Sequence, residues 1–351
     1  MPMSPPLSDT DARLLNLLQQ QVPLTPEPFT DLASQLNLPE SEILSRITAL
    51  KSQPAPIIRQ ISAIFDTKSL GYQSTLVAAR IPHEHLDHAV SVINAHPGVT
   101  HNYLRNHPFS LWYTLAVPPD SRLGLQRTLD ILHCESRSLA TRPFPTLKLY
   151  KIGVSFDLSS DADPAARSTG PAFTESDRAQ AMSHLITPAD KRMIRVLQQD
   201  LPMTHRPFDL WAQQAKVSTD QLLWAARTYL GQKRMRRFAA VLHHRQAGFS
   251  ANGMGIWAVT PDKQDTFGSV AASFAAVSHC YLRPTYEDWP YSIFTMVHAP
   301  TQPDCDAVLA QISKATGIKD YAALYSTREF KKTRLRYFTE EIEAWEQSHP
   351  A

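Results

Sequence analysis

Histidine, tyrosine and arginine recur with the same spacing at two places in the chain. The first phrase, which starts at Val99, reads VTHNYLR, and the second, which starts at Val277, reads VSHCYLR. Because alternate residues of a β-strand share one face, each phrase predicts a row of side chains on one side of a sheet. The predicted rows are Val99, His101, Tyr103, Arg105 and His107 in the first phrase, and Val277, His279, Tyr281 and Arg283 in the second.

The side chains of these rows suit a flat, conjugated and anionic ligand. Arginine pairs with carboxylates, tyrosine stacks or donates a hydrogen bond, and histidine coordinates a metal or transfers a proton near neutral pH. A solvated outer face, or a face buried at a subunit contact, is the alternative interpretation. The repetition of the row in two otherwise different halves favours a site, but the residue types leave binding and catalysis both open.

The second half carries further residues of the same chemical kinds. Its stretch RRFAAVLHH begins with Arg236 and Arg237 and ends in His243 and His244, where the first half has RQISAIFDT. Neighbouring residues of a strand face opposite ways, so only one of these two histidines can enter a pocket. Surface polarity is the alternative explanation for the histidine pair.

Aromatic and basic residues accompany the rows. The second half inserts PTYEDWPY after its arginine, which adds Tyr286 and Trp289, where the first half has only NHPF. Basic residues near the ends of the two halves are either carboxylate anchors or charges that protect a sheet edge; they are Lys148, Lys151, Arg328, Lys331, Lys332, Arg334 and Arg336. By contrast, His83 and His85 stand at an expected helix start with a spacing that does not share a helix face, so we expect no metal site there.

An internal duplication supplies the elements that position these residues. LSDTDARLLNLLQ, from Leu7, matches LITPADKRMIRVLQ, from Leu185, and the match continues through both histidine rows. In each half, a capped first helix precedes a helix-turn-helix outline and a wing strand, and strands and helices then follow in the order βαββαβ. LKLYKIGVSF and REFKKTRLRYF are expected to be the closing strands of the first and second unit.

The predicted fold class is α+β, a tandem duplication of a winged helix-turn-helix and a ferredoxin-like (βαββαβ) sandwich domain. The expected ranges are 7–68 for the first winged helix, 72–157 for the first ferredoxin-like domain, 158–183 for a flexible linker, 184–246 for the second winged helix, 249–337 for the second ferredoxin-like domain, and 338–351 for a C-terminal helical tail.

Composition excludes several classes of protein. The formal charge of +2 comes from 35 basic and 33 acidic residues, so no global field attracts nucleic acid or an anionic membrane. The three cysteines contain no CxxC pair, which indicates a reducing compartment and no cysteine-ligated cluster. Neither a leader sequence nor a membrane-spanning run is evident, and the Gly-rich phosphate loops GxGxxG and GxxxxGK[ST] are missing. We therefore expect a cytoplasmic protein without nucleotide-dependent chemistry.

A DNA-binding regulator is the obvious alternative for a helix-turn-helix protein. The second helix of the motif, however, begins with ESE at Glu40 in the first half and with STD at Ser218 in the second. A recognition helix presents arginine, lysine, asparagine or glutamine there, and acidic residues are repelled by phosphate. The outline of the motif is present without the chemistry of base readout.

Long phrases of the chain resemble the siroheme decarboxylases, which are relatives of the Lrp/AsnC regulators. The resemblance covers residues 7–157 and 184–337 and is carried by GVTHNYLRNHPFSLWYTL, PTLKLYKIGVSF, RRFAAVLHHRQAGF, VSHCYLRPTYEDWPYSIFTM and REFKKTRLRYF. It implies an Lrp/AsnC-type fold for both halves. The fused arrangement looks like the NirD–NirL type on the route to heme d1, whereas related AhbA/AhbB pairs serve an alternative heme pathway.

The resemblance implies a carboxy-lyase that removes the C12 and C18 acetate carboxyl groups of siroheme as CO2, giving 12,18-didecarboxysiroheme. It implies histidine acid–base catalysis without a cofactor or metal beyond the iron of the substrate. The implied catalytic residues are His279, Tyr281, His243 or His244, and His101 in a second or vestigial site, which Asp66 and Thr67 in place of the two histidines put in doubt. The implied substrate-binding residues are Arg283, Arg236, Arg237, Tyr286, Trp289, Lys331, Lys332, Arg105, Tyr103 and Lys151.

The expected partners are siroheme and didecarboxysiroheme, with no nucleic acid and no membrane. The ferredoxin-like sheets are expected to pair face to face, either between subunits or, through the fusion, within one chain. A transcriptional regulator and a non-catalytic heme- or siroheme-binding protein remain the alternative functions.

Overall fold

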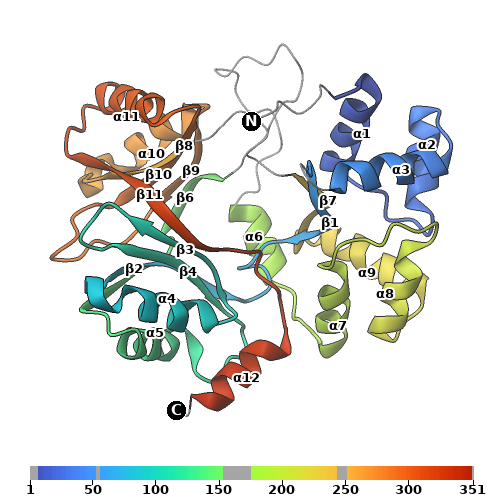
Figure 1. The fold of residues 1–351 in the computed structure, drawn as a ribbon, viewed down its shortest axis with the longest axis horizontal. Coiled ribbons are helices and arrows are strands. Elements are labelled where there is room, and N and C mark those ends of the chain that lie inside the picture. Colours follow the sequence, from blue (N-terminus) through green and yellow to red (C-terminus); the bar gives the residue numbers. More distant parts are fainter. Residues whose placement is uncertain (1–6, 53–55, 153–174, 243–250, 350–351) are drawn as a thin grey trace.

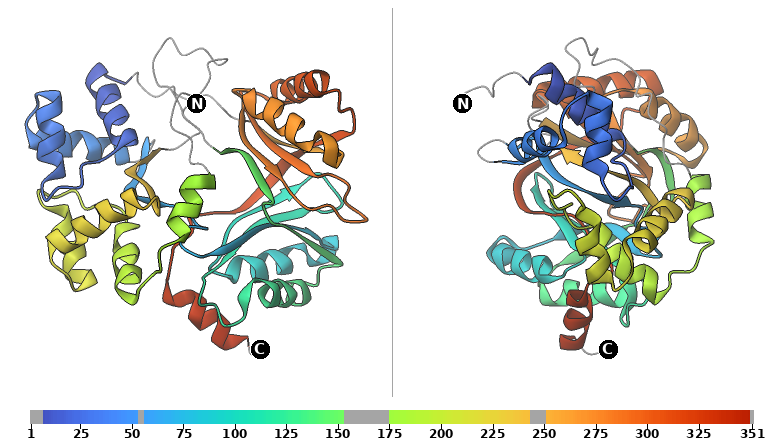
Figure 2. Two further views of the ribbon diagram at one scale, coloured as in Figure 1. Left: turned by 180° about the vertical axis from the view of Figure 1, so that it is seen from behind. Right: turned by 90° about the vertical axis from the view of Figure 1, so that its right-hand side faces the viewer.

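The computed structural model describes residues 7–52, 56–152, 175–242 and 251–349. Figure 1 shows the helix-turn-helix motifs gathered on one side of the molecule and the long strands on the other. Figure 2 shows the same division from behind and from the side of the helix-turn-helix motifs. The two helix-turn-helix motifs therefore lie together, and so do the two sets of long strands, although the members of each pair come from different halves of the chain.

The winged-helix elements match the sequence expectation. In the first half they are α1 (Asp9–Gln20), α2 (Pro28–Leu36), α3 (Glu40–Lys51) and β1 (Ile58–Phe65), and in the second they are α7 (Pro188–Leu197), α8 (Pro207–Ala215), α9 (Thr219–Gly231) and β7 (Met235–Leu242). The side chain of Ser8 caps α1, and Thr187 forms a capping box at α7, as predicted. Asn37 adopts the left-handed conformation, with φ of 55°, at the turn that separates α2 from α3.

The two winged helices form one unit. β1 and β7 pair as a two-stranded antiparallel sheet, with Ala63 opposite Phe238. Backbone hydrogen bonds also cross between the halves, from Val22 to Phe238 and from Leu201 to Ile61. One hydrophobic core, which includes Leu14 and Phe29 as well as Phe208, Trp211 and Phe238, lies beneath both motifs. Each wing therefore depends on the other half for its packing and for its hydrogen bonds.

The remaining elements form two ferredoxin-like units. The first contains β2 (Gln73–Arg80), α4 (Leu86–Ala95), β3 (Val99–Arg105), β4 (Leu111–Val117), α5 (Gly124–Glu135) and β5 (Ala140–Phe144), and the second contains β8 (Ala251–Trp257), α10 (Gln264–Ser273), β9 (Val277–Leu282), β10 (Ile293–Ala299), α11 (Gln302–Thr316) and β11 (Tyr321–Lys332). Short 3-10 turns, η1 (His83–His85) and η3 (Pro261–Lys263), precede α4 and α10. The strand orders β5-β2-β4-β3 and β11-β8-β10-β9 confirm the βαββαβ prediction.

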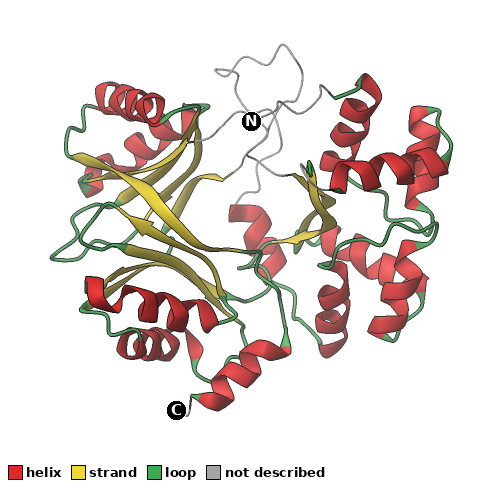
Figure 3. Ribbon diagram, in the orientation of Figure 1, coloured by secondary structure: helices red, strands yellow, loops and turns green. Residues whose placement is uncertain are grey.

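The two units stack as four layers, which Figure 3 shows as helices outside and sheets inside. Helices α4 and α5 cover one outer face, and α10 and α11 cover the other. Aromatic residues of both halves, among them Trp112, Phe144, Trp289 and Phe294, pack together between the sheets. The face-to-face pairing expected of such sheets is thus made within one chain.

The closing strands differ from the sequence expectation. LKLYKIGVSF does not close the first unit: β6 (Lys148–Ile152) pairs with β9 of the second half, and β5 is the closing strand. REFKKTRLRYF does not close the second unit either, because β11 pairs with β8 only over Tyr321–Tyr325 and continues beside β3 of the first half. β5 contains Pro143, and it lies at the end of the strand order, where a missing N–H is tolerated.

Within the described residues, exchange of these extensions joins all strands except the wings into one nine-stranded sheet, with the order β5-β2-β4-β3-β11-β8-β10-β9-β6. The expected linker also differs, because its last part forms α6 (Glu175–Met182). The C-terminal helix α12 (Glu340–Ser348) is present as predicted, and it packs Trp345 against His96, with ring centroids 4.4 Å apart.

Among the helices that the structure describes, none combines the length and the apolar character needed to cross a membrane.

Candidate functional site

The histidine and tyrosine of each row lie on the inner face of their sheet, the face that is turned toward the sheet of the other half. The His101 and Tyr103 rings lie 6.1 Å apart, and the His279 and Tyr281 rings lie 5.9 Å apart. Tyr103 is opposite Trp112 on β4, and Tyr281 is opposite Phe294 on β10. Because both Trp112 and Phe294 belong to the core between the sheets, the tyrosines and histidines share that inner face.

The valine of each row lies on the other face. Val99 and Val277 belong to the cores beneath the helices, although each is only two residues before its histidine. The pairing of each strand shifts at this point, between Val99 and Asn102 and between Met296 and Val297. This extra residue is a β-bulge, which turns the histidine to the inner face. The expectation that valine and histidine line up is therefore wrong, and the bulge is the reason.

The row arginines connect the halves. Arg105 donates a 2.8 Å hydrogen bond to the Leu324 carbonyl of β11, and Arg283 donates to the Phe144 carbonyl of β5. Their guanidinium groups also lie 5.9 Å and 4.8 Å from the rings of Tyr103 and Tyr281. Both are buried, and burial lowers the pKa of each arginine to about 10. This geometry makes them positioning residues for the tyrosines.

His279 is held in a weakly hydrated environment. Its Nδ1 lies 2.8 Å from Ser278 Oγ, and this hydroxyl donates in turn to the Met296 carbonyl at 3.3 Å. Burial lowers the pKa of His279 to about 4, and the positive charges of His298, Arg236 and Arg283 contribute further. His279 is consequently neutral at pH 7, with Nε2 as its basic nitrogen when Ser278 accepts from Nδ1.

His101 has different neighbours. Its Nδ1 lies 2.9 Å from Thr100 Oγ1. Burial lowers the pKa of His101, Lys332 and Arg59 act in the same direction, and Glu329 opposes them. The first row therefore combines one histidine with a lysine and a carboxylate.

The exchanged strands create this difference between the rows. Lys332 of β11 pairs with His101, whereas Ile152 of β6 pairs with His279. Likewise Glu329 pairs with Tyr103, whereas Leu149 pairs with Tyr281. The second row thus has the apolar Leu149 opposite its tyrosine, where the first row has the charged Glu329.

Several other predicted substrate-binding residues lie away from the rows. Lys151 donates 2.8 Å to the Phe274 carbonyl, and Lys331 donates 2.7 Å to the Asn94 carbonyl, both on the helix-covered faces. Arg237 donates 3.2 Å to the Gln19 carbonyl in the winged-helix unit. Arg236, in contrast, is exposed on β7 and acts electrostatically on His279.

Tyr286 and Trp289 join the core between the sheets. Trp289 is buried against Trp112 and Phe144, with ring centroids 5.4 Å and 5.2 Å away. His107 lies in the same cluster, 5.1 Å from Trp289. Tyr286 donates to the Pro143 carbonyl, so the aromatic stretch anchors the second half on β5 of the first.

Two residues beside the rows were not predicted as site residues from the sequence. Two other residues, which were predicted, cannot be placed. Arg59 of β1 corresponds to Arg236 in the internal repeat, so the repeat could have identified it as a site residue. The repeat aligns His298 of β10 with Ala116, and this difference between the halves is visible in the sequence. The predictions on His243 and His244 lie outside the described residues.

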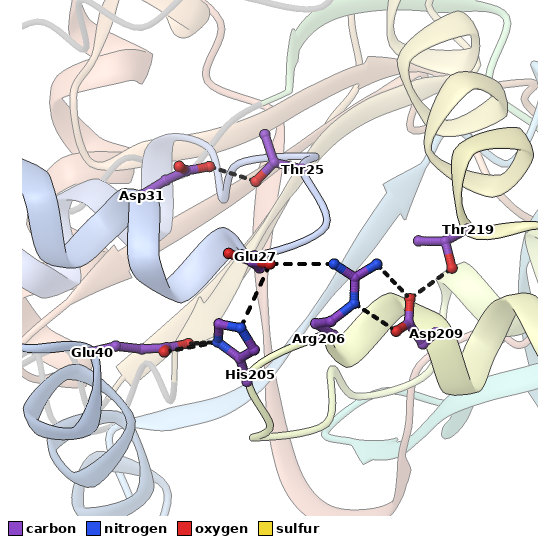
Figure 4. Close-up of polar contacts among 8 residues, drawn as sticks. All are labelled: Thr25, Glu27, Asp31, Glu40, His205, Arg206, Asp209 and Thr219. Carbon is purple, nitrogen blue, oxygen red and sulfur yellow. Dashed lines mark hydrogen bonds and ion pairs between the residues drawn. The ribbon is translucent and has the colours of Figure 1, made fainter.

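The helix-turn-helix surface contains an ion-pair cluster between the two halves (Figure 4). His205 Nδ1 lies 2.9 Å from Glu40 at the start of α3, and Arg206 lies 3.2 Å from Glu27 and 2.8 Å from Asp209. Thr219 of α9 also donates to Asp209, at 2.6 Å. The start of α3, which would enter a DNA groove, is therefore acidic and is bonded to the neighbouring motif, whereas the start of α9 is bonded to α8 of its own motif.

Comparisons with known protein families agree with this architecture. Residues 11–59 and 190–236 match the siroheme decarboxylase NirDL-like HTH domain, and residues 69–151 and 246–331 match the AsnC-like ligand binding domain. Both models match once in each half, which confirms the duplication from an independent source.

Similar proteins span nearly the whole chain. The siroheme decarboxylase of Hydrogenobacter thermophilus is 35% identical over 95% of this chain and 96% of its own. The siroheme decarboxylase beta subunit of Methanosarcina barkeri is 42% identical over 42% of this chain and 97% of its own. A crystal structure of the siroheme decarboxylase NirDL in complex with an iron-uroporphyrin III analogue has a TM-score of 0.76 and 31% identity, over 96% of this chain and 97% of that one.

Proposed function

The chain belongs to the siroheme decarboxylase family in its fused NirDL form, and from this we propose that its second histidine row is the reaction site. Siroheme is the substrate, and the products are CO2 and the 12,18-didecarboxylated macrocycle, on the route to heme d1. The observation that carries the choice of row is strand exchange: β6 places the apolar Leu149 opposite Tyr281 in the second row, whereas β11 places Glu329 and Lys332 opposite Tyr103 and His101 in the first. Loss of a carboxylate is favoured where the carboxylate is poorly solvated.

Substrate recognition is proposed to rest on the wing arginines and the row tyrosines. Arg236 is exposed beside His279, and Arg59 is exposed beside His101, so each half offers one guanidinium from its wing. Arginine pairs with peripheral carboxylates, and tyrosine stacks on a conjugated ring. Lys332 adds a second cation beside the first row, which suits that row to holding a carboxylate more than to expelling one.

The proposed mechanism is acid–base catalysis. The acetate C–C bond breaks, CO2 leaves, and the electron pair is delocalised into the macrocycle. His279, protonated under the influence of the bound carboxylates, then returns a proton from its ring to the methylene carbon, leaving a methyl group. Each of the two decarboxylations takes up one proton, so histidine must be reprotonated between them.

We propose that no cofactor is needed beyond the iron tetrapyrrole of the substrate itself. The protein is proposed to work without nucleic acid and in the cytoplasm. Further association through the inner sheet faces is not proposed, because these faces already cover each other within the chain.

Anaerobic incubation of the purified protein with siroheme, followed by mass spectrometry, tests this function. We expect the mass of the tetrapyrrole to fall by two CO2. An unchanged mass at full occupancy would instead indicate a non-catalytic tetrapyrrole-binding protein.

Matched variants then identify the working row. His279→Ala should lower kcat by at least about 100-fold, the usual range for a general acid, whereas His101→Ala should act mainly on KM. Equal kcat losses in both variants would contradict the assignment of the reaction to the second row.

A further inference from the structure

His298 lies on the same inner face as His279. Strand β10 pairs without interruption with β8 from Ile293 to Ala299, so its alternate residues share one face. Phe294 and Met296 of this face pack in the core between the sheets, and Met296 is directly opposite His279. The next residue on that face is His298, which is half-buried.

The second half differs from the first at this position. The repeat places Ala116 where the second half has His298, and Ala116 is buried against the winged-helix core. The first half therefore has a buried alanine, and no histidine, at the position that corresponds to His298. A histidine at this position of the neighbouring strand therefore accompanies His279 but not His101.

Building on the function proposed above, we propose that His298 is a positioning residue that holds a proton and passes it to His279 between the two decarboxylations. His298 takes up this proton from water. Its charge then opposes protonation of His279 until carboxylates of the substrate are bound. The proton moves from the His298 ring to the neutral His279 ring, and His298 is recharged from solvent.

The groups that act on His279 limit the alternatives. They include Tyr281 of β9, Arg283 directly after β9, and Arg236 of β7. Strand β6 places Leu149 opposite Tyr281. Its two lysines bond elsewhere, because Lys148 bonds Asp265 and Lys151 bonds the Phe274 carbonyl on the opposite side. Opposite His298 on β8 is the uncharged Asn252. Within the described residues, His298 is thus the titratable partner of His279 near neutral pH.

The test is the pH profile of decarboxylation by the full-length His298→Ala variant with siroheme. We expect kcat to fall about 10-fold with an unchanged KM, and partly decarboxylated product to accumulate. The basic limb of the kcat profile should move to higher pH, because removal of the neighbouring charge raises the pKa of His279. Added imidazole should restore part of the rate, which it would not do for a packing defect.

His133→Ala is the matched control. His133 is also half-buried, but it lies on the outer helix α5 and contacts Thr141 at 3.0 Å. This variant should keep the wild-type profile. An unchanged rate and profile in His298→Ala would overturn the proposal for His298, whereas absence of decarboxylation by the wild-type protein would overturn the proposed function itself.

Discussion

At the scale of single residues, the low pKa of His279 explains why its ring is neutral in the free protein and takes up a proton when the substrate binds. Burial lowers the pKa of His279 to about 4, well below the ordinary value of 6.5. A buried imidazolium without an anion is costly, whereas a neutral imidazole is not. Substrate carboxylates supply the missing negative charge and raise the pKa when they bind.

Proton uptake should therefore accompany substrate binding. Between about pH 5 and pH 7 the free His279 is neutral, so binding of siroheme raises its pKa and draws in a proton from the buffer. Isothermal titration calorimetry in buffers of different ionisation enthalpy measures this uptake, which should decrease by up to one proton in His279→Gln. The same uptake in both proteins would show that another group takes the proton.

At the scale of elements, β-bulges and exchanged strands build the site. The bulge in each row turns histidine to the inner face, and β6 and β11 then determine which residues lie opposite each row. β6 is fixed in turn by α10, because Tyr150 packs directly over Gly268. Lys148 and Tyr150 also both bond Asp265 at the start of α10, at 2.7 Å and 2.8 Å.

Gly268→Ala tests the seating of β6. A Cβ at this position would lie 2.5 Å from the Tyr150 ring, so the variant must displace this ring and disturb the seating of β6. We expect the free energy of unfolding to fall by about 1–3 kcal/mol, the usual cost of overpacking, and decarboxylation to slow. Gly231→Ala is the control, because nothing lies within 4 Å of its added Cβ. Urea denaturation compares them, and equal stability would contradict the direct contact.

The winged helices have the outline of a DNA-binding motif, and ion pairs join the two motifs to each other. His205 and Arg206 bond acidic residues across the two motifs, which cancels charge and fixes one motif on the other. Each exposed pair contributes little by itself, about 0–1 kcal/mol. Their consequence for the site is positional, because the joined wings β1 and β7 carry Arg59 and Arg236.

At the scale of the whole molecule, neither half is complete. β6 leaves the first half for the second sheet, β11 leaves the second for the first, and β1 pairs with β7. The aromatic core between the sheets takes residues from both halves. The duplication therefore produces one interdependent fold with two unequal rows.

Separate expression of residues 1–157 and 184–351 tests this dependence. Each half alone should be insoluble or largely unfolded by circular dichroism, because it exposes an aromatic sheet face and unpaired strands. Coexpressed halves should assemble and decarboxylate siroheme. Two independently folded halves would contradict the interlocked arrangement.

The sequence by itself determined the kinds of elements and the chemistry available. Periodicity, capping residues and the internal repeat predicted the winged helices, the βαββαβ order and the His-Tyr-Arg rows, because these depend on local spacing. Only the tertiary structure decided which strand borders which row, that Arg105 and Arg283 serve packing, and that His298 lies on the face of His279. KLYKI and REFKK each suit a strand, and their partners are set by long-range pairing and by bulges that no local pattern records.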